Sequence, residues 1–165
     1  MKLNCDKTKF MIINFCTSAQ FQTRLYIEQS MIEQVRESQL LGVIISDDLT
    51  WRSNTKAITR KTNQRMIILR KLFEFKVSDK DMIQIYKLFI RSVLETSCVV
   101  WATSITQEER ALIERVQKIA LKIIYGERYL SYENALNISN LSSLSERRIK
   151  LTLNFAKKCI KILKQ

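Results

Sequence analysis

The stretch IISDDLTW, Ile44 to Trp51, lies where the pattern of the sequence changes. Before it, short runs rich in β-branched and aromatic residues are separated by polar segments, which is typical of strands. After it, apolar residues recur at steps of three and four, which is typical of amphipathic helices. The 165-residue chain is 46% hydrophobic, which is enough for a buried core. We therefore expect an α+β protein with a small β-rich part, residues 1–50, followed by a mainly helical part, residues 51–165.

Local signals predict where several elements begin and end. The expected strands are KFMIINF (Lys9–Phe15), RLYI (Arg24–Ile27) and LLGVII (Leu40–Ile45). Ser78 precedes one helical run, and Thr106 and Ser143 begin TQEE and SLSE, which match the capping box. Gly126 ends the run after Thr106, where a left-handed C-cap is expected. The last segment places five apolar residues on one helical stripe: Ile149, Leu153, Ala156, Ile160 and Leu163.

The adjacent aspartates Asp47 and Asp48 raise the question of a polymerase-type metal site. Two-metal phosphoryl transfer needs a further carboxylate from a separate strand. No acidic residue upstream of Asp47 lies in an apolar strand suited to that task. Aspartates just before a helix also favour a turn and the positive end of the helix dipole. We interpret the pair as turn or cap residues, and we expect no catalytic residue and no metal site in this chain.

The charge of the chain is strongly basic and unevenly placed. The formal net charge is +12, and the segment from Arg52 to Arg91 holds eleven basic and three acidic residues. Such an excess favours a polyanionic partner, nucleic acid first and an anionic membrane surface second. A well-solvated basic surface without a specific partner is the alternative interpretation.

The helix expected just after Trp51 carries this charge on one face. At 100° per residue, its apolar sector contains Ile58, Thr62, Met66, Leu69, Leu72 and Phe73. The opposite sector contains Lys56, Arg60, Asn63, Arg70 and Lys71. Arg65 falls in the apolar sector, so the separation is imperfect. We take the four cations Lys56, Arg60, Arg70 and Lys71 as candidate nucleic-acid contacts, with a solvated basic face as the alternative.

Other classes of protein are disfavoured by composition. The chain has four cysteines without CxxC spacing and no histidine, so a zinc site is not expected. No apolar run approaches the roughly 18 residues of a membrane span, and no signal peptide is visible. We expect a protein with free thiols that does not enter membranes and is located inside the cell, in the cytoplasm or the nucleus.

Four segments in order carry a resemblance to a known family. They are LNCDKTKFMI (Leu3–Ile12), LLGVIISDDLTW (Leu40–Trp51), TKAITRKTNQRMIILRKLF (Thr55–Phe73) and the run from Tyr86 to Gly126. Together they resemble the C-terminal part of the reverse transcriptase of a non-LTR retrotransposon of the jockey or CR1 type. The resemblance covers essentially the whole chain.

The resemblance implies a remnant of the polymerase palm, ending in a strand that grips the primer, followed by a helical thumb and C-terminal region. The implied ancestral activity is RNA-directed DNA synthesis, and this part would hold the RNA/DNA primer-template. The catalytic aspartates would lie upstream of Met1, in a polymerase region that this chain does not contain. That missing region is an expected partner of the chain. The chain alone is therefore expected to be inactive and to hold no cofactor, whereas the full-length polymerase would use Mg²⁺.

Two further residues acquire possible roles from the resemblance. Lys7 matches a lysine that follows the catalytic loop, although a surface lysine beside a strand is the alternative. Gly42 matches a glycine of the primer-grip strand, where the backbone approaches closely, and a β-bulge is the alternative. The segment WRSN after Trp51 departs from the family, which often has histidine there. Two other interpretations of the chain stay open: a non-enzymatic basic helical module that binds nucleic acid or an acidic protein, and the decayed product of a truncated element.

Overall fold

The computed structural model describes residues 4–15 and 23–163. The chain divides into two compact units, Met1–Asn54 and Thr55–Gln165, and each is described by itself. The division falls inside the first long helix, a few residues after the change of pattern expected at residue 50. The protein is mainly helical with three two-stranded sheets in its described part, which is compatible with the α+β class.

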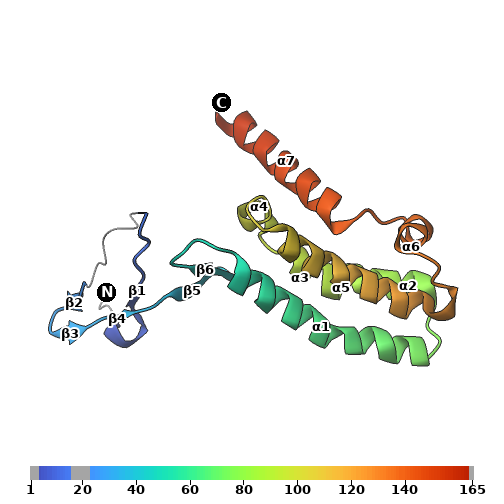
Figure 1. Ribbon diagram of the computed structural model, residues 1–165, viewed down its shortest axis with the longest axis horizontal. Coiled ribbons are helices and arrows are strands. Elements are labelled where there is room, and N and C mark those ends of the chain that lie inside the picture. Colours follow the sequence, from blue (N-terminus) through green and yellow to red (C-terminus); the bar gives the residue numbers. More distant parts are fainter. Residues whose placement is uncertain (1–3, 16–22, 164–165) are drawn as a thin grey trace. The chain divides into compact units, whose positions relative to one another are not determined.

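The unit Met1–Asn54 is built from very short elements. A 3₁₀ turn, η1 (Cys5–Lys7), precedes the strands β1 (Lys9–Phe10), β2 (Tyr26–Ile27), β3 (Ser30–Met31), β4 (Glu33–Gln34), β5 (Glu37–Leu40) and β6 (Val43–Ser46). β1 pairs with β4 in parallel, whereas β2 with β3 and β5 with β6 form antiparallel pairs. Figure 1 shows these strands in blue to blue-green.

The expected continuous strand from Leu40 to Ile45 is wrong, because the chain reverses within it. Leu41 and Gly42 have φ values of 49° and 85°, and they form the two-residue turn between β5 and β6. Two residues with positive φ suit the twist of a hairpin, and glycine adopts such a φ without steric cost. The strands expected at Lys9–Phe15 and Arg24–Ile27 are also shorter than predicted, since only two residues of each pair with a partner.

Few apolar side chains are buried in the described part of this unit. Among its described residues only Ile32 and Val43 are buried hydrophobic residues, at 4% and 6% exposure. Phe15 and Leu41, in contrast, are 84% and 89% exposed. Hydrophobic burial therefore stabilises this unit weakly.

Polar contacts connect the β5–β6 hairpin with the first turn of the next helix. The Ile44 amide donates to Asn54 Oδ1 at 3.2 Å, and Asn54 is 1% exposed. The Ser53 hydroxyl donates to the carboxylate of Glu37. Both pairs lie within Met1–Asn54, so the start of the helix belongs to the hairpin.

The remaining elements are helical. They are α1 (Arg52–Glu74), α2 (Asp79–Ile85), the π-helix η2 (Tyr86–Arg91), α3 (Ser92–Glu95), α4 (Cys98–Trp101), α5 (Gln107–Tyr125), the 3₁₀ turn η3 (Gly126–Arg128), α6 (Tyr132–Ser139) and α7 (Leu144–Leu163). In Figure 1, α2, η2 and α3 follow one another as a nearly continuous helix. α5 packs against α2, α6 and α7, and α7 also packs against α4.

The predicted helix starts are confirmed. Ser78 accepts a hydrogen bond from the Asp81 amide at 3.3 Å. At α5 both bonds of the capping box form, because Thr106 Oγ1 accepts from the Glu109 amide at 3.2 Å and Glu109 Oε2 accepts from the Thr106 amide at 2.7 Å. At α7 the hydroxyl bond forms, with Ser143 Oγ accepting from the Glu146 amide at 3.2 Å. Each bond satisfies an amide that has no partner within its own helix.

The end of α5 was predicted correctly in position but not in conformation. Helix α5 ends at Tyr125, and Gly126 has φ 52° and ψ −125°. This ψ differs from that of a left-handed cap and lies in a region that is disfavoured for residues with a Cβ. A Cβ at Gly126 would lie 2.6 Å from the Phe73 ring, so this glycine also allows close packing against the end of α1.

The core of Thr55–Gln165 contains large side chains from most of its helices. Tyr86, Trp101, Leu121 and Leu144 are fully buried. Trp101 Nε1 donates to the Thr96 carbonyl at 3.0 Å, so its polar atom is satisfied.

Helix α7 turns a different face inward from the one its apolar stripe suggests. Ile149, Leu153 and Ile160 of that stripe are 54–58% exposed, whereas Leu144 and Arg148 are buried at 0% and 3% exposure. The inward face is therefore rotated from the apolar stripe, and an arginine occupies a core position. No helix of the described part is long and apolar enough to cross a bilayer.

Candidate nucleic-acid interface

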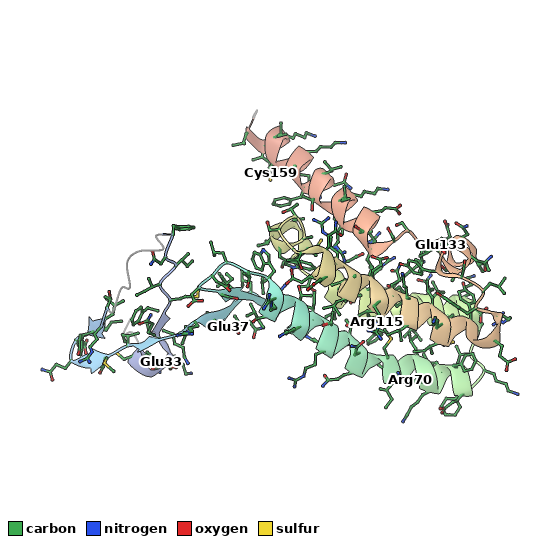
Figure 2. The ribbon with its side chains drawn as sticks, in the orientation of Figure 1. Glu33, Glu37, Arg70, Arg115, Glu133 and Cys159 are labelled. Carbon is green, nitrogen blue, oxygen red and sulfur yellow. The ribbon has the colours of Figure 1, made fainter. Side chains whose placement is uncertain are left out.

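The four candidate cations of α1 all lie on its solvent face. Lys56, Arg60, Arg70 and Lys71 are exposed, as 100° per residue predicts. Figure 2 labels Arg70 on this helix. Because α1 is a regular helix of 23 residues, the four side chains follow one face over several turns.

The opposite face of α1 packs into the core of Thr55–Gln165. Met66 and Leu69 are 1% and 0% exposed, and Thr62 is fully buried with its hydroxyl donating to the Ile58 carbonyl at 2.9 Å. Phe73 departs from the expectation of a core residue, since its side chain is 44% exposed. Burial of the remaining apolar sector leaves the cationic sector facing outward.

Arg65 explains the imperfect separation of the two sectors. Its guanidinium Nη1 donates to the Phe89 carbonyl in η2, 24 residues further along the chain. The half-buried Arg65 thus contributes to packing between α1 and η2 rather than to the exposed cationic face. A basic residue in an apolar sector can be accommodated in this way when a backbone acceptor is within reach.

The cations of this face have no carboxylate partners in the described part of the chain. Other arginines do: Arg128 pairs with Asp79 at 2.8 Å, and Arg147 and Arg91 both contact Glu95. Helix α1 holds seven basic residues and only Glu74 as an acid. The positive potential of its outer face is therefore not neutralised by ion pairs, and it is available to an anionic partner.

One apolar residue of this face was not singled out by its sequence. Ile67 lies seven residues after Arg60 and three before Arg70, which places it on the same side of the helix, and it is 54% exposed. Helical projection alone could have located it, because its angle falls among the cations. An exposed isoleucine between cations offers an apolar contact as well as charge.

Gly42 lies at the exposed turn of the β5–β6 hairpin. A Cβ built at Gly42 would have no neighbour within 4 Å among the described residues, so close packing does not require glycine here. Its position in a turn differs both from the strand interior and from the β-bulge that were expected. The conformation, φ 85°, accounts for glycine here.

Lys7 ends the turn η1 and its side chain is exposed. Its backbone amide donates to the Asn4 carbonyl and to Asn4 Oδ1, at 3.2 and 3.3 Å. Lys7 and Gly42 belong to Met1–Asn54, whereas the four cations of α1 belong to Thr55–Gln165. The six predicted residues thus form separate groups on two units.

Asp47 and Asp48 form a turn, as predicted. The Asp47 amide extends the hairpin by donating to the Arg36 carbonyl at 2.8 Å. Asp48 Oδ1 accepts from the amide and the hydroxyl of Thr50, both at 2.9 Å. The backbone amide of Thr50, followed by its hydroxyl, lowers the pKa of Asp48 below the ordinary aspartate value. The oxygen of Asp48 is therefore used locally to shape the turn that leads into α1.

No group of three or more histidine, cysteine or acidic residues in the described part could hold a metal ion. Cys5, Cys98 and Cys159 are free thiols, and burial raises the pKa of Cys98. This thiol is consequently less available as a thiolate.

The chain matches no protein-family model, no curated protein and no solved structure. Its function is therefore inferred from the residues of α1 and their surroundings.

Proposed function

We propose that this chain binds the backbone of a nucleic-acid duplex through the outer face of α1. The observation that carries the proposal is the row of exposed cations without carboxylate partners: Lys56, Arg60, Arg70 and Lys71. Lysine and arginine side chains on one helix face contact phosphates, which fix position without reading sequence. Binding would be electrostatic and nearly independent of base sequence.

We further propose that the chain is the C-terminal part of a non-LTR retrotransposon reverse transcriptase, with α1 in the thumb and the β5–β6 hairpin in the place of the primer grip. The order of a hairpin directly followed by a basic helix supports this assignment. The exposed turn at Gly42 would allow a primer backbone to approach closely, because no side chain occupies that position. Lys7 would belong to the remnant of the palm.

In this proposal the chain holds primer-template and another segment performs the chemistry. Asp48 is engaged by Thr50 in a turn, which leaves the aspartate pair unsuited to a two-metal site. Purified chain with Mg²⁺ or Mn²⁺ is therefore expected to incorporate no nucleotide. Incorporation that disappears in Asp47→Asn would contradict the assignment.

The salt dependence of duplex binding tests the role of α1. If about three or four phosphates are neutralised, log affinity falls against log salt with a slope on the order of −3. Replacement of Lys56, Arg60, Arg70 or Lys71 by alanine should flatten the slope by roughly one unit each, for every base sequence alike. Fluorescence anisotropy with duplexes of different sequence measures both quantities.

Lys157 and Lys161 of α7 provide a charge-matched control. Both are exposed on a helix, and their replacement removes the same charge as replacement of Lys56 and Lys71. The α7 pair should change the slope by much less. If both pairs of replacements reduced duplex affinity and the salt slope equally, binding would depend only on net charge. That result would support a basic surface without a specific partner.

A helical module that binds an acidic protein is the second candidate, and Ile67 favours it. Protein interfaces combine a buried apolar residue with surrounding charge, and Ile67 lies exposed among the cations of α1. Ile67→Ser should weaken binding to an acidic protein while leaving duplex affinity nearly unchanged. Competition between duplex and an acidic peptide that also carries apolar side chains, measured with this variant, discriminates the two partners.

A further inference from the structure

A second positively charged site lies in a cavity lined by α5, α7 and the segment that follows α4. The cavity measures about 220 Å³, and Arg110, Ser145, Arg148 and Thr152 provide polar groups to its lining. All of its lining residues belong to Thr55–Gln165, and none belongs to α1. A water molecule takes about 30 Å³ of liquid volume, so the cavity has room for a small polyatomic ion.

Arg148 is the central residue of this cavity. It is 3% exposed, yet its Nη1 and Nη2 atoms have no hydrogen-bond partner. Thr152 Oγ1, one helical turn further along α7, is also buried without a partner. Buried polar groups in native proteins are nearly always bonded to protein, water or an ion, because leaving a buried donor without an acceptor is costly, and more so for a charged group. Arg148 and Thr152, both on α7, therefore provide neighbouring donors without acceptors in the protein. This arrangement points to an acceptor on a bound ligand.

The surrounding charges leave Arg148 without a direct partner. Burial lowers the pKa of its guanidinium, Glu114 and Glu95 favour its charge, and Arg110 opposes it. Yet no carboxylate lies within ion-pair distance of Arg148 or Arg110 in the described part of the chain. Glu114 accepts from the Leu144 and Ser145 amides at 3.1 and 3.2 Å, so it is engaged at the start of α7.

The backbone amides at the start of α7 already have acceptors, so they do not form the anion site. Leu144 and Ser145 donate to Glu114, and Glu146 donates to Ser143. An anion in the cavity would therefore be held by side chains, namely two guanidinium groups and the hydroxyls of Ser145 and Thr152.

We infer that this cavity binds a phosphate group through Arg148, Arg110, Thr152 and Ser145. Guanidinium groups bind phosphate oxygens in pairs, and hydroxyls add single donors. A tetrahedral oxyanion accepts bonds from several directions, which suits donors on different helices better than a planar carboxylate does. The inference does not rest on the role of α1 in nucleic-acid binding.

Inorganic phosphate is the probe for the first test. Phosphate should raise the melting temperature of the full chain in a saturable manner, relative to chloride at equal ionic strength, because a ligand of the folded state stabilises it. Line broadening in ³¹P NMR should report the same binding directly. No saturable effect of phosphate beyond that of chloride would overturn the inference.

Arg148→Met separates an anion site from a purely structural arginine. Methionine removes the buried charge with similar volume, so stability in chloride should be unchanged or higher. Phosphate affinity should fall at least roughly tenfold, since bonds to a charged donor are lost. A variant that is less stable in chloride yet binds phosphate normally would show a structural role and would refute the site.

Thr152→Val and Arg110→Gln keep the test decisive if Arg148→Met does not fold. Each should reduce phosphate affinity by about three- to tenfold. Lys150→Gln is the matched control, because Lys150 lies on the same helix but is exposed and does not line the cavity. If Lys150→Gln and Arg110→Gln lowered phosphate affinity equally, the affinity would depend only on net charge, which would contradict the inference.

The source of the phosphate follows from competition in a variant that lacks Lys56, Arg60, Arg70 and Lys71. Displacement of bound phosphate by a 5′-phosphorylated oligonucleotide, but not by its 5′-hydroxyl counterpart, would identify a strand end as the ligand. Bound phosphate that neither oligonucleotide displaces would identify the free ion as the ligand. Retention of phosphate binding in this variant is expected under either source, and its loss would overturn the separate site. Loss of duplex binding in the same variant would test only the proposed role of α1 and not the phosphate site.

Discussion

Asp48 shows how a single side chain can resemble a catalytic group while shaping the backbone. Thr50 donates to it twice, and these bonds hold the pKa of Asp48 below the ordinary value. A carboxyl whose pKa is lowered in the folded state contributes stability above its unfolded-state pKa. That contribution is lost as pH falls through the folded-state pKa.

We predict that Thr50→Val raises the pKa of Asp48 without restoring it fully. The substitution removes the hydroxyl donor but keeps the Thr50 backbone amide, which is the larger cause of the shift. A ¹³C NMR titration of the aspartate carboxyls measures the change. An unchanged Asp48 titration in the variant would argue against the turn.

Gln117 connects the helices η2, α5 and α6 through side-chain hydrogen bonds. It is fully buried, accepts from the Tyr86 hydroxyl at 2.6 Å, and donates to the Tyr132 hydroxyl and the Ser142 carbonyl at 2.9 and 3.0 Å. Tyr132 in turn donates to Glu114, which caps the start of α7. These bonds extend from η2 through α5 to the elements that follow it.

Gln117→Met should lower the free energy of unfolding by about 1–3 kcal/mol, because the buried Tyr86 hydroxyl loses its acceptor. Urea denaturation followed by circular dichroism measures the loss. In a Tyr86→Phe background the same substitution should cost less, since no hydroxyl is left without a partner. Equal costs in both backgrounds would contradict a network that depends on this bond.

At the scale of elements, the junction between α5 and η3 depends on glycine for two reasons. Gly126 has a backbone conformation that residues with a Cβ avoid, and a Cβ there would lie 2.6 Å from the Phe73 ring. We predict that Gly126→Ala lowers the melting temperature, with about 1–3 kcal/mol lost to backbone strain.

The variant Phe73→Leu separates strain from the steric clash at Gly126. In this background Gly126→Ala should lose less stability than in the parent chain, but still some, because the strain persists. Thermal unfolding of the four proteins provides the comparison. A fully neutral Gly126→Ala would show that the chain relaxes this junction without cost.

The elements that could be predicted from the sequence are those set by local bonds. Ser78, Thr106 and Ser143 start their helices because each hydroxyl accepts an amide three residues away, which the sequence alone displays. The solvent face of α1 follows in the same way from helical projection. The hairpin turn at Leu41 and Gly42 was missed because its apolar flanks resemble one continuous strand.

What could not be predicted depends on packing between distant segments. Helix α7 has a clear apolar stripe, but its contacts with α4 and α5 place Arg148 inward and leave Ile149 and Leu153 exposed. The cavity around Arg148 combines residues of α5 and α7 with the segment that follows α4, so no local pattern could reveal it. Gln117 was overlooked because a polar residue is expected outside, unless its partners are known.

At the scale of the whole molecule, the two units differ in how much apolar surface they bury. Met1–Asn54 has two buried hydrophobic residues in its described part, whereas Thr55–Gln165 contains most of the core. The strands of Met1–Asn54 are two to four residues long, and their edges are largely unpaired. Such short strands are expected to open readily.

We predict that backbone amides of residues 9–15 and 23–45 exchange with solvent faster than those of α5. Hydrogen exchange followed by mass spectrometry on the full chain measures both regions at once, and α5 is the internal standard. Strong and uniform protection over residues 9–15 and 23–45 would show that the first unit closes a core of its own.

Four of the buried side chains in the nearly continuous helix from Asp79 to Glu95 lie at equal intervals along the sequence. Met82, Tyr86, Ile90 and Leu94 are each four residues apart, and none is more than 1% exposed. In a regular α-helix every four-residue step rotates a side chain by roughly 40°, so three steps would carry Leu94 about 120° away from Met82. The wider turn of η2 holds more residues and rotates the chain back. Local unwinding of the helix thus brings four bulky side chains into phase on one side, whereas the same spacing in a regular α-helix would spread them around the helix axis.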